Sequence, residues 1–296
     1  MKKRLLLAGT LMMSLMAFSS LSIAQEMSVQ QGDSTIEVQA SEGIEWHRDR
    51  QVYIAIGDAV AVRDDLTVYA DRLLAHYRSE EDREDIYKVE AVGQVRIVTE
   101  NGEEIFGDHA IYFLEEGSLE VTGDDLRYVS AEETVTARDS LEYEENADGP
   151  GPIAIARGNA FVDRANGDQI RGDVITAYFE DTANGETENG DSENGGSEMQ
   201  EAEAVGNVEV ENDTVFASGE QGVYYAHNET ATLEGNVKVT RGNNQLNGDR
   251  AEINMRTGVS RLLATEGQGV SGLISPDEED DTSGSSGNND NAPESQ

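Results

Sequence analysis

A short block that recurs along the chain constrains the fold more than any other feature. Each copy begins with Gly, continues with Asn, Asp or Gln, and then alternates apolar with polar residues. Clear copies start at Gly57, Gly93, Gly158, Gly206 and Gly235, with a weaker one at Gly123. Their glycines are spaced 36, 30, 35, 48 and 29 residues apart. Such periods indicate tandem supersecondary units that bury a shared core.

Within each unit the apolar residues recur with a period of two. Val237 and Val239 alternate with Asn236 and Lys238, which is typical of a half-buried strand. Gly-Asn and Gly-Asp pairs suit turns that need a positive φ. We therefore expect an all-β chain of roughly 15 to 18 short antiparallel strands joined by tight turns.

A second block follows the first in most units. It reads Gly107-Asp108, Gly172-Asp173 and Gly248-Asp249, with degenerate forms at Ala70-Asp71 and Gly219-Glu220. We interpret Asp108, Asp173 and Asp249 as turn residues. The helix-like stretch from Asp71 to Asp85 aligns with strands in other units, so we predict a strand, a turn and a strand there.

The first 24 residues predict export. Lys2, Lys3 and Arg4 precede an apolar run from Leu5 to Phe18, and Ser22-Ile23-Ala24 forms a small-x-small cleavage site. The run is shorter than the ~20 residues that a spanning helix needs. The chain has no cysteine, which excludes disulfides, thiolate metal sites and a lipoprotein anchor. A cleaved signal peptide over 1–24 and a bacterial periplasmic location are the expectation.

Two segments interrupt or follow the repeat. Residues 181–200 are acidic, rich in Gly and Asn, and nearly free of large apolar side chains. Residues 275–296 form an acidic tail rich in Ser, Gly and Asn. Both compositions are typical of disorder. We expect one repeat domain over 25–263 that contains the first segment as a disordered insert.

These blocks resemble the OstA-like family of periplasmic lipopolysaccharide-transport proteins, the LptA family. The resemblance is clearest in Gly235-Asn236-Val237-Lys238-Val239 followed by Leu246-Asn247-Gly248-Asp249-Arg250-Ala251. The ending Thr257-Gly258-Val259-Ser260-Arg261-Leu262 is similar to the form seen in alphaproteobacteria. The resemblance spans roughly Ile54 to Leu263, most of the chain after the signal peptide.

The resemblance implies an open antiparallel β-jelly roll, a sheet folded into a V or U with an apolar trough. It also implies that the trough holds the acyl chains of lipopolysaccharide and passes them from the inner to the outer membrane. The partners would be lipopolysaccharide, an inner-membrane docking protein, an outer-membrane receptor and further copies joined head to tail. We predict that the apolar residues of the repeat line the trough: Val60, Val62, Val95, Ile97, Val208, Val210, Val237 and Val239.

The composition and the absence of known motifs argue against several other functions. A net charge of −39 argues against nucleic-acid binding, because phosphates would be repelled. Catalysis is disfavoured because no nucleophile-elbow, zincin or P-loop pattern is present. The four histidines, His47, His76, His109 and His227, have no metal-ligand spacing. We expect no catalytic residue, no metal and no cofactor. The remaining alternative is an exported structural or adhesive β-repeat protein without lipid cargo.

Overall fold

The computed structural model describes residues 25–31, 34–64, 66–80, 83–145, 151–181, 197–257, 259–264 and 269–273. The predicted signal peptide, the predicted tail and most of the predicted insert lie outside these residues. The described part contains 19 β-strands and a single 3-10 turn, η1 (Ala226–Asn228), so the all-β prediction is confirmed. The chain divides into two units, which meet after Leu126.

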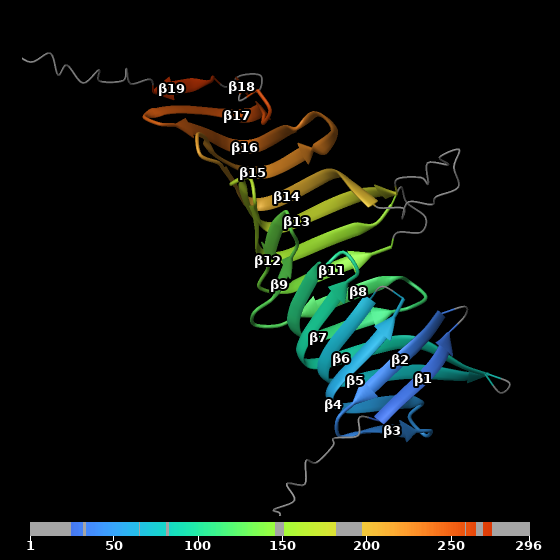
Figure 1. The fold of residues 1–296 in the computed structure, drawn as a ribbon. Helices are drawn as coiled ribbons and strands as arrows, with labels where there is room; N and C mark the ends of the chain where they lie inside the picture. Colours follow the sequence, from blue (N-terminus) through green and yellow to red (C-terminus); the bar gives the residue numbers. More distant parts are fainter. Residues whose placement is uncertain are drawn as a thin grey trace, which may run out of the picture. The chain divides into compact units, whose positions relative to one another are not determined.

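The described residues of the first unit form the strands β1 to β8 (Figure 1). They are β1 (Gln25–Gln31), β2 (Ser34–Ala40), β3 (Gly43–His47), β4 (Val52–Arg63), β5 (Leu66–Glu80), β6 (Arg83–Thr99), β7 (Glu104–Phe113) and β8 (Ser118–Thr122). From β4 onward each strand pairs antiparallel with the next in sequence. The stretch after Asp71 lies in β5 and β6, so its helix-like pattern was correctly interpreted as strand.

The second unit contains the remaining strands. They are β9 (Arg127–Val129), β10 (Glu133–Thr136), β11 (Ser140–Glu144), β12 (Ile153–Arg164), β13 (Gln169–Asp181), β14 (Ser197–Glu211), β15 (Phe216–Tyr225), β16 (Thr230–Arg241), β17 (Asn244–Asn254), β18 (Val259–Leu263) and β19 (Ser271–Leu273). Strands β12 to β18 are sequential antiparallel neighbours. Strand β13 includes Asp181 and β14 begins at Ser197, so ordered strands extend into both ends of the predicted insert.

The recurring Gly-Asn blocks lie inside strands, and the prediction that they form turns was wrong. Between β14 and β15 the register shifts after Val205 and resumes at Val208, which leaves Gly206-Asn207 as a β-bulge. Gly206 and Asn207 have φ of 78° and 49°, so the expected positive φ is present. The blocks starting at Gly57, Gly93, Gly158 and Gly235 behave alike. A bulge bends its strand, so each strand is long and angled rather than short.

The acidic residues of the second block accompany these bulges and are not turn residues. Asp173 lies within β13, and its carboxylate accepts hydrogen bonds from Asn207 Nδ2 at 3.1 Å. Asp71 accepts one from Gln94 Nε2 at 3.1 Å, and Glu220 accepts one from Asn236 Nδ2. The first and second blocks of the repeat therefore contact each other across neighbouring strands, at the bend that the bulge makes.

Both units bury one face of their sheets. In the second unit the cross-strand row Ala156, Ile175, Ala204, Gly222, Leu233 and Ala251 is buried. A second buried row follows the bulges, where Ala160, Val208 and Val237 lie at corresponding positions of β12, β14 and β16. The bulges bend the strands between the two rows. The fold of each unit is thus an open antiparallel jelly roll, as predicted (Figure 1).

Trp46 lies on β3 and is 46% exposed. Its ring stacks on Tyr53 with centroids 5.6 Å apart, and its Nε1 donates to the Tyr77 hydroxyl at 2.8 Å. The Arg48 guanidinium lies 3.9 Å from the ring centroid. In the described part of the chain β3 pairs with β4 alone, so Trp46 packs on an edge strand of the first unit.

Candidate functional site

The second unit contains an apolar groove between the two arms of its bent strands. The groove encloses ≈ 600 Å³, including space that is open to solvent. Its inward-facing aliphatic lining is Ile170, Ile175, Ala202, Ala204, Val208, Val210, Ala231 and Leu233. Since nearly all of its exposed lining is carbon, the groove can accept hydrocarbon and offers little to a polar ligand.

The bulge of β14 explains how one strand lines both sides of this groove. Ala204 precedes Gly206-Asn207 and Val208 follows it, yet both side chains line the groove. Val205, the intervening residue on the opposite face, is 49% exposed. The bend therefore aims the residues before and after the bulge at the same cavity.

The rim of the groove carries charged residues where β12 turns into β13, and Glu203 of β14 also belongs to the lining. Arg164 and Asp168 line it where β12 turns into β13, and the Arg164 Nε lies 3.6 Å from the Glu133 carboxylate. Burial raises the pKa of Glu133, while the charge of Arg164 opposes that shift. The lining thus includes charges of both signs beside its aliphatic side chains.

A second compartment of ≈ 430 Å³ adjoins the first. It is lined by Val210, Asn212, Thr214, Val215, Ala217, Ile253, Asn254 and Met255. Val210 and Met255 line both compartments. The two compartments therefore share a boundary at these two side chains, and the second is the more polar because Asn212, Thr214 and Asn254 line it.

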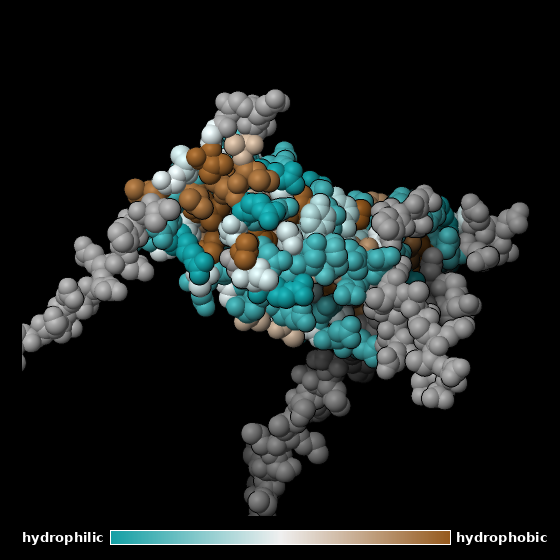
Figure 2. Space-filling view, turned by 90° about the horizontal axis from the view of Figure 1, so that it is seen from above, coloured by the Kyte–Doolittle hydropathy of each residue, from teal (hydrophilic) through white to brown (hydrophobic). Residues whose placement is uncertain are grey.

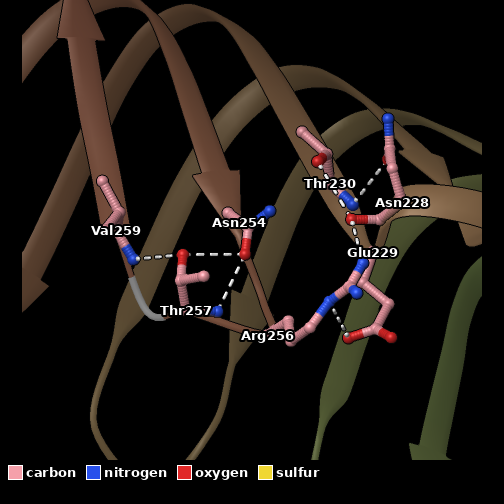
Figure 3. Close-up of polar contacts among 7 residues, drawn as sticks. All are labelled: Asn228, Glu229, Thr230, Asn254, Arg256, Thr257 and Val259. Carbon is pink, nitrogen blue, oxygen red and sulfur yellow. Dashed lines mark hydrogen bonds and ion pairs between the residues drawn. The ribbon is translucent and has the colours of Figure 1, made fainter.

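The turn that carries Met255 is held by polar contacts (Figure 3). The Asn254 side-chain oxygen accepts from the Thr257 backbone N–H and hydroxyl, each at 2.8 Å. The Arg256 Nε lies 3.7 Å from the Glu229 carboxylate. Glu229 itself has a left-handed backbone, with φ of 53°, and follows η1. These contacts tie the β17–β18 turn to the β15–β16 connection beside it.

The structure separates the predicted trough residues into three groups. Val208 and Val210 line the groove. Val95, Ile97, Val237 and Val239 are buried on the inner face of their own unit and do not line the two described compartments. Val60 and Val62 lie on the opposite face of the sheet, where Val62 is 37% exposed.

The placement of Val60 and Val62 has a simple cause. The residue directly after each Gly-x pair points inward, as Val95 and Val208 do. In the first copy that residue is Ala59, which is fully buried, so Val60 and Val62 fall on the other face.

Several residues that line the groove were not predicted from the sequence. Ile170, Ala202, Leu233 and Met255 line the groove but precede or follow the Gly-Asn-Val blocks. Apolar and polar residues alternate in Ala202-Glu203-Ala204 and in Ala231-Thr232-Leu233. This alternation could have identified Ala202 and Leu233 as residues of the buried face. Nothing in the local sequence indicates that Met255, in a turn, reaches the groove.

The first unit brings together a polar cluster that the sequence did not predict. Glu90 on β6 lies 2.5 Å from Lys88 Nζ, 3.2 Å from His76 Nε2 and 4.0 Å from His109 Nε2. Burial and the charge of Lys88 lower the pKa of His76, whereas the nearby Glu90 carboxylate acts to raise it. Burial alone would raise the pKa of Glu90, but its contacts with Lys88 hold it below its ordinary value. The cluster's charges are thus compensated internally.

Two further searches concern only the described residues. No group of three or more His, Asp or Glu side chains there is arranged to hold a metal ion. No helix within that part of the chain is long and apolar enough to span a membrane.

Comparison with known proteins gives one family match. Residues 153–259 match the model of the family described as LptA/(LptD N-terminal domain) LPS transport protein. No curated protein matches the chain. Among solved structures, LptH from Pseudomonas aeruginosa, described as the LptA homologous periplasmic component of the conserved lipopolysaccharide transport device, is 16% identical. That match covers 49% of this chain and 95% of LptH, with a TM-score of 0.36.

Proposed function

We propose that this chain, in which residues 153–259 form a domain of the LptA/(LptD N-terminal domain) family of LPS transport proteins, binds the acyl chains of lipopolysaccharide in the groove of its second unit. One observation carries the proposal. Every residue that lines either compartment, from Arg164 to Met255, falls inside the segment that matches the family. The family is one of transport proteins, in agreement with the prediction that the chain is not an enzyme.

The groove suits a carrier energetically. Burial of hydrocarbon stabilises by about 0.8 kcal/mol per methylene, so ten methylenes contribute about 8 kcal/mol before ordering costs. The net charge of −39 opposes the phosphates of lipid A, so the head group lies outside the groove, near the rim that holds Arg164. A moderate net affinity lets the cargo be both taken up and released.

The proposed setting is the periplasm, between an inner-membrane docking protein that supplies lipopolysaccharide and an outer-membrane receptor that accepts it. Support comes from the family match and from the export signal expected at residues 1–24. The structural or adhesive alternative needs an ordered β-repeat as well. It does not need a groove whose exposed lining is nearly all carbon, and that feature favours the carrier.

The test is site-specific photo-crosslinking on two consecutive residues of β14. A photoreactive residue at Val210 lines the groove, whereas one at Glu209 lies on the opposite face. With lipopolysaccharide present, irradiation is expected to give an adduct at Val210 and none at Glu209. Absence of the Val210 adduct from a protein with an intact β circular-dichroism spectrum would reject lipid cargo and favour the structural alternative.

Head-to-tail association of copies is the second part of the proposal. Figure 2, which looks onto the end that carries β17 to β19, shows hydrophobic surface gathered there. Val259, Leu263, Val270 and Leu273 are the exposed large apolar residues of this end. Within the described residues β18 and β19 each pair only with β17, so both present a free strand edge.

Substitution at this edge is expected to weaken association. Leu273→Arg places a charge on the 66% exposed Leu273, which should lower the association constant by tenfold or more in sedimentation equilibrium. Val205→Arg, on an exposed site away from that edge, is the matched control. Equal association by both variants and the wild type would refute an interface at β18 and β19.

A further inference from the structure

We propose that Met255 separates the apolar groove of the second unit from the compartment beside it and thereby sets the length of acyl chain that binds in the groove. The inference rests on the proposed function, because it takes an acyl chain as the occupant. It adds a residue that determines specificity.

The position of Met255 follows from the lining of the two compartments. The first lies among Ile175, Ala204 and Leu233, and the second among Val215, Ala217 and Ile253. Met255 and Val210 belong to both linings. Val210 comes from β14, within the sheet, whereas Met255 comes from the turn after β17. The two side chains therefore form the boundary between the compartments.

The backbone at this boundary is fixed, and the side chain is adaptable. The Met255 N–H donates to the Glu229 carbonyl at 2.8 Å, and both neighbours of Met255 make the turn contacts drawn in Figure 3. A methionine side chain is unbranched and has three rotatable bonds, so it fills irregular space and can be repacked. Met255 thus has an adaptable side chain on a backbone that is held in place by hydrogen bonds.

This arrangement predicts a break in the dependence of affinity on chain length. Each methylene that enters an apolar groove tightens binding about fourfold. The increase holds while the chain extends through the first compartment. Once the chain end meets Met255, added methylenes remain in water and the affinity stops rising.

The experiment titrates the full chain with a homologous series of alkyl maltosides, below their micelle concentrations. These probes are nonionic, so the acidity of the protein does not affect them. For the wild type we expect about fourfold tightening per methylene up to a limiting length. For Met255→Ala the rise should continue into the second compartment, so that probes two methylenes beyond the limit bind tenfold or more tightly than they bind the wild type.

Three variants complete the test. Met255→Leu keeps most of the volume and should keep the wild-type limit, while Met255→Phe should move the limit to shorter chains. Met199→Ala removes a methionine of β14 that lines neither compartment and should change nothing. Met255→Phe also decides the matter if Met255→Ala fails to fold.

The outcomes separate this inference from the proposed function. A limit that is the same in the wild type, Met255→Ala and Met255→Phe would overturn the role of Met255 while leaving acyl binding intact. If the wild type bound no probe of any length, the proposed function and the inference would both be overturned.

Discussion

Val210→Asp is expected to weaken binding of lipopolysaccharide at least 100-fold, which corresponds to about 2.7 kcal/mol. Val210 lines both compartments, so a carboxylate there would be covered by hydrocarbon with no partner to replace its lost water. Burial of an unpaired charge costs more than this, and the group would bind protons or keep the lipid out. Equilibrium binding to the purified protein measures the change.

The matched control for this substitution is Val205→Asp. Val205 lies on the same strand and is 49% exposed on the other face, so a charge there remains hydrated. Its affinity should stay within about twofold of the wild type. Val210→Thr preserves shape and adds one hydroxyl, which provides a milder variant if the aspartate unfolds the chain. Equal affinity of all four proteins would contradict binding in this groove.

Gly206→Ala is expected to destabilise the second unit by about 2–5 kcal/mol. Gly206 has φ of 78°, where an L-residue costs about 1–2 kcal/mol. A Cβ there would also overlap the Asp173 carboxylate, which lies against the bulge. Overpacking of this kind costs a further ~1–3 kcal/mol. Urea unfolding monitored by circular dichroism provides the free energies.

Gly167→Ala separates the two causes. Gly167 has φ of 90°, but nothing lies within 4 Å of a Cβ placed there, so only the backbone cost of about 1–2 kcal/mol applies. Adding Asp173→Ala to Gly206→Ala should recover part of the loss, since it removes the carboxylate that the new methyl meets. If both glycine substitutions cost the same, the bulge is not packed against Asp173 as described.

The repeat blocks illustrate why the sequence predicted strands and positive φ yet assigned them wrongly to turns. A hairpin turn and a β-bulge both need residues that tolerate the left-handed region, and Gly206-Asn207 satisfies either. The two differ only in whether the chain reverses or continues with the same neighbours. That is decided by pairing with β13 and β15, whose partner residues are up to 42 positions away in sequence.

The sequence by itself determined that the chain is built of β-strands in which apolar and polar residues alternate. A period of two makes alternate side chains share a face, and one face must leave water. It therefore placed Val95, Val208 and Val237 in alternating apolar positions, and all three are buried in the structure. Tertiary structure alone decided that Val208 lines a groove while Val237 packs in the core, and that Met255 reaches that groove from a turn. These depend on the bend at each bulge and on registers between strands, which no local pattern encodes.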